Sequence, residues 1–141
     1  MCNQYSFFEH SNWDWDDIHP DLTIKLFYDL SFTIECSICT EVLCKPVTIR
    51  CGHSFCYNCI SKWFRTELIC PYCRTIVTNA PILNYTLNEI VDNFFEFLSD
   101  HTVDDEERRR LILSRRERFI AFDNALELNG LFGNLFIHLK D

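Results

Sequence analysis

The chain has 141 residues, with 48% hydrophobic and 15% aromatic side chains, which suits one modest folded domain with helical additions. Its formal charge of −8 argues against nonspecific binding of nucleic acid, because such binding draws on an excess of positive charge. No run of about 18 apolar residues occurs, and residues 1–10 lack the basic start and apolar core of a secretory signal. We therefore expect an intracellular protein without a membrane partner.

Residues 1–35 are predicted to be an acidic and aromatic segment that contains a helix. The Trp-Asp-Trp-Asp-Asp run at residues 13–17 indicates a solvated tail, with a partner-docking motif as the alternative. Pro20 suits the first turn of a helix, and apolar side chains recur around it at intervals of four. The spacing predicts a helix over residues 20–30.

Residues 36–74 carry eight cysteines and one histidine, and seven of these cysteines stand with the histidine at close, regular spacing. A Cys-x2-Cys turn lets two thiolates converge from one tight loop, and thiolate and imidazole are preferred ligands of Zn²⁺. Cysteine pairs interleaved with a histidine favour metal over disulfides, and therefore a reducing compartment, the cytosol or the nucleus. Eight ligands suffice for two closed structural zinc sites, in which no water can bind for hydrolysis. The predicted ligands are Cys36, Cys39, Cys51, His53, Cys56, Cys59, Cys70 and Cys73.

The stretch from the first to the last ligand has only 38 residues, too few for a sufficient core of its own. Two structural zinc ions, each worth on the order of 10–16 kcal/mol in small peptides, can supply the missing stability. We expect a strand at 47–49 paired with 54–55, a turn at 51–53 and a helix over 56–64.

The spacing leaves open which ligand pairs share an ion. Cys2 and Cys44 remain as free thiols. Ionising the seven ligand thiols and binding two Zn²⁺ ions changes the formal charge of the chain from −8 to −11.

The first part of residues 75–141 is predicted to be a helix that ends near residue 99. Thr86 and Glu89 form a capping-box pattern, and Tyr85 and Ile90 stand at the positions of a hydrophobic staple. Apolar side chains then recur on one face of this helix.

A second helix is expected from about residue 104 to residues 129–130. Its first turn is acidic, which suits the helix dipole, and a glycine follows its last residue. The apolar residues 131–139 are expected to dock on the preceding helices rather than to anchor in a membrane.

The same helix carries a basic cluster, which we interpret as a solvated face paired with Glu106, Glu107 and Glu117. The alternative is a surface for nucleic acid or for an acidic protein. The cluster consists of Arg108, Arg109, Arg110, Arg115, Arg116 and Arg118.

The ligand string and the residues between the ligands resemble a RING finger. This family forms a small α+β module with two cross-braced zinc ions, flanked here by predicted α-helices. The resemblance is carried by residues 36–39 (Cys-Ser-Ile-Cys), 51–56 (Cys-Gly-His-Ser-Phe-Cys), 59–64 (Cys-Ile-Ser-Lys-Trp-Phe) and 70–74 (Cys-Pro-Tyr-Cys-Arg). Cross-bracing implies a first zinc on Cys36, Cys39, Cys56 and Cys59 and a second on Cys51, His53, Cys70 and Cys73.

RING domains mostly act as E3 ubiquitin ligases, which bind a ubiquitin-charged conjugating enzyme and form no covalent intermediate. The resemblance implies that Ile38, Trp63 and Pro71 contact the conjugating enzyme. Arg74 would be the linchpin that hydrogen-bonds ubiquitin and this enzyme together. An aromatic anchor in an apolar patch and a rigid guanidinium fork suit these roles.

Other interpretations stay open at this point. Each of the four residues could serve the structure alone. The module could also be a RING that scaffolds or pairs with an active partner, or a zinc-dependent nucleic-acid binder that uses the basic cluster.

Residues 80–91 resemble the Asn-x-x-Leu stretch and helix that follow many RING fingers, including nuclear checkpoint and chromatin-linked ones and fungal nuclear ligases. This resemblance favours the nucleus over the cytoplasm. The flanking helices, over residues 18–30 and 87–98, could build a homodimer interface or only a helical buttress. The protein substrate is not indicated.

Overall fold

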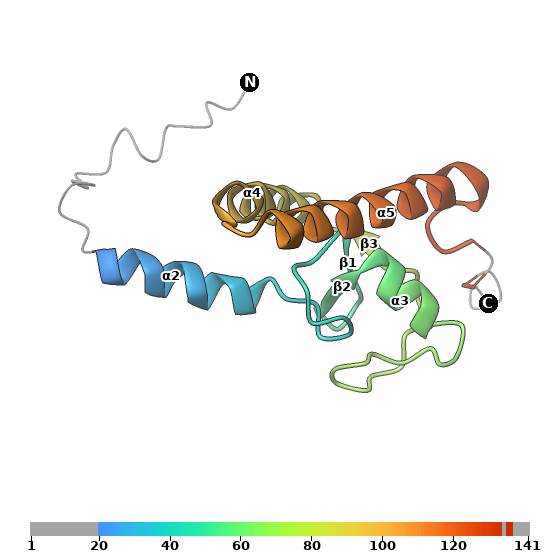
Figure 1. The fold of residues 1–141 in the computed structure, drawn as a ribbon. Helices are drawn as coiled ribbons and strands as arrows, with labels where there is room; N and C mark the ends of the chain where they lie inside the picture. Colours follow the sequence, from blue (N-terminus) through green and yellow to red (C-terminus); the bar gives the residue numbers. More distant parts are fainter. Residues whose placement is uncertain (1–19, 134, 137–141) are drawn as a thin grey trace, which may run out of the picture. The chain divides into compact units, whose positions relative to one another are not determined.

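The computed structural model describes residues 20–133, 135 and 136, so Cys2 and the acidic run at 13–17 lie outside the described part. The chain divides into two compact units, residues 1–33 and residues 34–141. In the first unit, helix α2 (Pro20–Thr33) begins where the sequence predicts and ends three residues later than expected (Figure 1). In its last turn, the hydroxyls of Ser31 and Thr33 donate to the carbonyls of Tyr28 and Asp29, at 2.6 and 3.0 Å.

A three-stranded antiparallel sheet lies at the centre of the second unit. The strands are β1 (Pro46–Thr48), β2 (Ser54–Cys56) and β3 (Ile82–Leu83), and β1 is in the middle. The predicted β1–β2 pair is confirmed with β1 one residue earlier, and Val47 lies opposite both Phe55 and Leu83. Gly52, at φ +90°, closes the hairpin and donates its N–H to the carbonyl of Ile49 at 2.8 Å.

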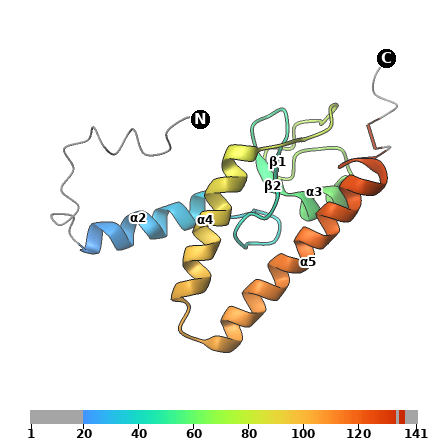
Figure 2. The same ribbon diagram turned by 90° about the horizontal axis from the view of Figure 1, so that it is seen from above.

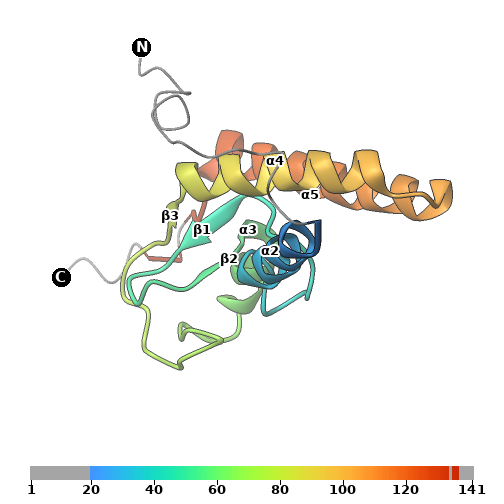
Figure 3. The same cartoon turned by 90° about the vertical axis from the view of Figure 1, so that its left-hand side faces the viewer.

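Three helices accompany the sheet: α3 (Tyr57–Trp63), α4 (Tyr85–His101) and α5 (Asp105–Asn129). Helices α4 and α5 meet at the 102–104 turn and diverge from it toward the zinc module (Figure 2). Helix α4 packs against β1 and α5 packs against α3, and both helices lie on one side of the sheet (Figure 3). The expected helical C-terminal region is therefore built onto the zinc module.

The predicted capping box of α4 is wrong. The N-cap is Asn84, whose side-chain oxygen accepts the N–H of Leu87 at 3.0 Å, and Tyr85 is 74% exposed, so the staple does not form. Strand β3 leads directly into α4, and the N–H of Asn84 donates to the carbonyl of Pro46 at 3.0 Å. Pairing with β1 therefore sets the first residue of the helix, and asparagine is as good a cap as threonine.

Helix α5 has the predicted ends. The Asp104 carboxylate accepts the N–H groups of Glu106 and Glu107 at 2.8 and 3.0 Å, and Gly130 follows at φ +71°. Beyond it, Phe132 and Phe136 are buried and pack edge-on against Tyr57 and Phe64. This agrees with the predicted docking of residues 131–139 for the residues that the structure describes, because 134 and 137–139 lie outside them. No described helix has the length and apolar character needed to cross a membrane.

The core of the second unit is small and lies between the sheet and its helices. Its most deeply buried apolar side chains come from β1, β2, α3, α4 and the segment before β1. These residues are Ile34, Val47, Phe55, Ile60 and Val91.

Candidate zinc centre and docking surface

The eight predicted ligands gather in two separate clusters. Within each cluster the ligand atoms lie within 4.8 Å of one another. The four-sulfur cluster and the three-sulfur, one-imidazole cluster are both sets that Zn²⁺ prefers, and neither leaves an open position for water. One contains Cys36, Cys39, Cys56 and Cys59, and the other Cys51, His53, Cys70 and Cys73. This is the cross-braced grouping that the resemblance implied and that spacing alone left open.

Two Cys-x2-Cys loops in different clusters share one backbone pattern. The N–H of Cys36 donates to the carbonyl of Glu41 at 2.9 Å, and the N–H of Cys70 donates to that of Thr75 at 2.8 Å. The residue just after each loop returns its own N–H to the first cysteine and adopts a left-handed conformation. These residues are Thr40, at φ 56°, and Arg74, at φ 60°. The ligand loops are thus held by the backbone as well as by metal.

In the first cluster the sulfurs crowd one another. The Sγ atoms of Cys39 and Cys56 are 3.9 Å apart, and the backbone N–H of Cys44 lies 3.2 Å from the Cys56 sulfur. Hydrogen bonding, chiefly with Cys39, lowers the pKa of Cys36, whereas hydrogen bonding, chiefly with Cys36, raises the pKa of Cys56. Four adjacent thiols cannot all ionise without a compensating cation, and Zn²⁺ supplies that charge.

In the second cluster the histidine presents its Nδ1 atom to the sulfurs. This atom lies 3.3 Å from the Sγ of Cys51 and 3.6 Å from that of Cys70. The Thr75 hydroxyl lies 3.1 Å from the Cys73 sulfur, and this hydrogen bond lowers the pKa of Cys73 to about 6. The donor set and its geometry fit a second structural zinc ion.

The comparisons with known proteins agree with this geometry. The family model described as "Ring finger domain" matches residues 34–74. RING finger protein PSH1 of Saccharomyces cerevisiae is 32% identical over 115 residues, which are 79% of this chain and 28% of that protein. E3 ubiquitin-protein ligase RNF8 of Mus musculus is 34% identical over 86 residues, which are 59% of this chain and 16% of that protein.

Residues 34–74 form a RING finger domain. The whole chain spans less than a third of the length of either relative. A solved RING finger-like domain, that of Retinoblastoma Binding Protein-6, is 32% identical over 45% of this chain and 74% of the solved chain, with a TM-score of 0.41. The assignment rests on the family match and on the two ligand clusters, which together identify a RING with two structural zinc ions.

The four predicted docking residues lie on the two ligand loops of the RING and on α3. Ile38 and Pro71 lie inside the loops and are half-buried, and Trp63, the last residue of α3, is half-buried too. The Trp63 indole donates from Nε1 to the carbonyl of Ile69 at 2.9 Å, which ties the end of α3 to the second loop. Arg74 is exposed and forms no ion pair with any residue that the structure describes.

The interpretation of the basic cluster as one solvated face is only partly right. Arg110 pairs with Glu107, and Arg108 pairs with Asp105, on the exposed surface of α5. Two other arginines turn toward the RING instead. Arg115, with 8% of its side chain exposed, pairs with Asp92 of α4, and Arg118 pairs with Glu41 of the first ligand loop.

Sequence reasoning missed these two contacts, although a signal was present. Positions 111, 115, 118, 119 and 122 share one face of a helix, since they are three or four residues apart. Phe122 on this face is buried, and the Arg115 guanidinium lies over the Phe95 ring at 4.4 Å. Arginines between apolar residues on one helix face therefore indicated that this face packs against the rest of the fold instead of facing solvent.

Proposed function

We propose that this protein is a RING-type E3 ubiquitin ligase. It would bind a ubiquitin-charged conjugating enzyme through Ile38, Trp63 and Pro71, while Arg74 holds ubiquitin against that enzyme. The observation that carries the proposal is that the three apolar residues are partly exposed, although they belong to the two ligand loops and to helix α3 of the RING. Partly exposed apolar anchors on a rigid frame are typical of interface hot spots.

The chemistry available to the RING limits the mechanism to positioning. Both zinc sites are closed, so they activate no water. Cys44 is 2% exposed, and burial raises its pKa to about 11, so this thiol is a poor nucleophile. The substrate lysine amine would therefore attack the thioester carbonyl directly. An isopeptide bond forms, the amine loses a proton, and the thiolate of the conjugating enzyme leaves.

Arg74 suits the linchpin role because its backbone conformation is fixed. Its N–H donates to the carbonyl of Cys70 at 2.9 Å, and its φ of 60° belongs to the hydrogen-bonded ligand loop. A guanidinium on such a fixed backbone can bridge two partners with little loss of freedom. Holding the ubiquitin thioester in one attack-ready pose would lower the entropic part of the barrier.

The test is discharge of ubiquitin from several charged conjugating enzymes to free lysine. We expect the wild type to accelerate discharge and Arg74→Gly to lose about 10- to 100-fold of that acceleration. Glycine tolerates φ 60°, so this variant relieves about 1–2 kcal/mol of strain and loses about 0.4–1 kcal/mol to added chain freedom. Its stability should therefore equal or exceed that of the wild type. Silence of the wild type with every enzyme would contradict the ligase proposal. Full activity of Arg74→Gly would contradict the linchpin role of Arg74.

Ile38→Ala separates docking from folding. We expect zinc content and melting temperature close to those of the wild type, because Ile38 is only half-buried. Affinity for the conjugating enzyme, measured by calorimetry, should fall about 30-fold or more if Ile38 is a hot spot worth about 2 kcal/mol. A collapse of the melting temperature instead would show that Ile38 is a core residue. If the wild type binds the conjugating enzyme but does not accelerate discharge, the scaffold alternative is favoured.

Location and self-association stay predictions. Fluorescence of a tagged protein in cells would show whether it enters the nucleus, stays in the cytoplasm or lies elsewhere. Sedimentation equilibrium would show whether the flanking helices form a homodimer. The nucleic-acid alternative loses ground because Arg108, Arg110, Arg115 and Arg118 have acidic partners.

A further inference from the structure

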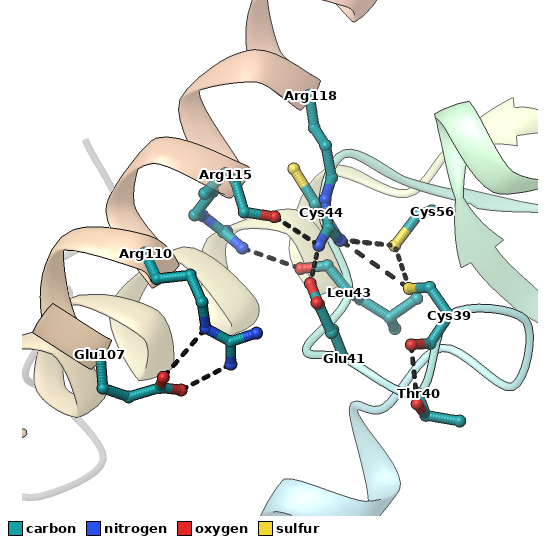
Figure 4. A network of polar contacts seen from close by, with 11 residues as sticks. Cys39, Thr40, Glu41, Leu43, Cys44, Cys56, Glu107, Arg110, Arg115 and Arg118 are labelled. Atoms are coloured by element: carbon teal, nitrogen blue, oxygen red, sulfur yellow. Dashed lines mark hydrogen bonds and ion pairs between the residues drawn. The ribbon is translucent and has the colours of Figure 1, made fainter.

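One arginine of α5 reaches the sulfur ligands of the first zinc site. The Nη1 atom of Arg118 lies 3.8 Å from the Sγ of Cys39 and 3.8 Å from the Sγ of Cys56 (Figure 4). Its Nη2 atom donates to the Ser114 hydroxyl at 3.0 Å and also pairs with Glu41. The side chain is 18% exposed, so solvent screens these contacts only in part.

The formal charge of the first zinc site explains why a positive side chain near its sulfurs matters. Four thiolates around one Zn²⁺ ion carry a formal charge of −2, whereas the three-thiolate, one-histidine site carries −1. A guanidinium donating toward two of the four sulfurs offsets part of the larger charge where the dielectric constant is low. Hydrogen bonds to ligand atoms commonly change metal affinity by about 10- to 100-fold.

Contacts of the helix around residue 118 place the Arg118 guanidinium near the sulfurs. Arg115, one turn earlier, donates from Nη1 to the carbonyl of Leu43 at 3.0 Å. Asn58 of α3 donates to the backbone carbonyl of Arg118 itself, at 3.3 Å. The backbone around residue 118 is therefore fixed to the RING from two sides, and the side chain needs little ordering to reach the sulfurs.

We propose that Arg118 is a charge-compensating and positioning residue of the first zinc site, so that retention of this zinc depends on the docked helix α5. The residue lies outside the stretch 34–74 that matches the RING family, so the dependence would be a property of this chain rather than of the RING alone. The proposal does not require ligase activity.

The competing explanation is that Arg118 only pairs with Glu41 and so helps to dock the helix. Three variants of the full chain separate the two. Arg118→Gln removes the charge near the sulfurs, and Glu41→Gln removes the ion pair but leaves that charge in place. Arg116→Gln, on the exposed side of the same helix, is the matched control.

The first measurement is the rate at which EDTA removes zinc, followed with a colour indicator. We expect Arg118→Gln to lose one of its two zinc ions about 10- to 100-fold faster than the wild type. Arg116→Gln should behave as the wild type, and Glu41→Gln should keep its zinc at least as well. Equal acceleration in Arg118→Gln and Glu41→Gln would overturn the proposal, as would no acceleration in Arg118→Gln.

The second measurement identifies the site. In protein loaded with ¹¹³Cd, the four-sulfur site and the three-sulfur, one-nitrogen site give separate resonances. Arg118→Gln should shift or broaden the four-sulfur resonance alone. Equal change in both resonances would mean a general loss of structure and would refute the specific role. If Arg118→Gln does not fold, Arg118→Lys replaces it, because lysine keeps the positive charge but lacks the planar guanidinium. Its zinc loss to EDTA should then be faster than that of the wild type by less than about 10-fold. A rate equal to that of the wild type would count against the role.

Discussion

Two residues that follow ligand loops of the RING hold the same unfavourable backbone conformation with very different side chains. Thr40 and Arg74 follow equivalent ligand loops, at φ 56° and 60°, and each donates its N–H to the first cysteine of its loop. A left-handed conformation costs an L-residue about 1–2 kcal/mol, and both positions carry that cost. Because threonine also occupies this conformation, the loop itself does not require an arginine. The guanidinium at position 74 is therefore not needed by the loop and is free for the linchpin role that we propose.

Thr40→Gly is the matched control for the variant at Arg74. Glycine at position 40 relieves the same strain and removes a small exposed side chain, whose hydroxyl donates to the Cys39 carbonyl at 2.7 Å. We expect the free energy of unfolding at fixed zinc to stay the same or rise by about 1 kcal/mol, and lysine discharge to match the wild type. Loss of discharge in Thr40→Gly would mean that backbone freedom, not the Arg74 side chain, explains the Arg74→Gly result.

At the scale of elements, the sequence pattern within a segment was enough to predict whether that segment is a helix. The pairing of one segment with another, such as β3 with β1, could not be predicted from these local patterns. The helical periodicity of α4 and the acidic start and terminal glycine of α5 were sufficient signals. Strand β3 has two residues, Ile82 and Leu83, which is too short for any alternation to be read. The strand forms by pairing with the free edge of β1. Because of this pairing, α4 is capped by Asn84 and not by the predicted Thr86.

The two candidate caps of α4 can be compared directly. Asn84→Ala removes the bond to the Leu87 N–H and a second one, from Nδ2 to the Thr48 hydroxyl at 3.2 Å. We expect it to lower the free energy of unfolding by about 1–2 kcal/mol. Thr86→Ala, at the position that the sequence pattern favoured, should change it by less than about 0.5 kcal/mol. Denaturant titration at fixed zinc measures both, and a larger effect at Thr86 would restore the capping box.

At the scale of the whole molecule, residues 34–141 form one compact unit, although the family match ends at residue 74. The ligand spacing was enough to predict two zinc sites, because eight soft ligands leave few other arrangements. The docking of α5 was not predicted, since it depends on single partners 72 residues apart, such as Arg115 and the Leu43 carbonyl. Interactions of this kind have no local pattern, and only the fold brings them together.

Removal of zinc should therefore affect more than the RING. Arg115 donates to the Leu43 carbonyl and Arg118 pairs with Glu41, and both of these partners follow the first two zinc ligands. Phe132 packs on Tyr57 of α3, so loss of both ions should remove much of the surface on which α5 and the tail dock. With EDTA we expect amide hydrogen exchange to accelerate in residues 34–77 and, together with them, in residues 115–122. Readdition of zinc should restore protection in both segments at one rate. Protection of residues 115–122 that survives zinc removal would show instead that α4 and α5 form an independent helical hairpin, and that the RING is docked on it without supporting it.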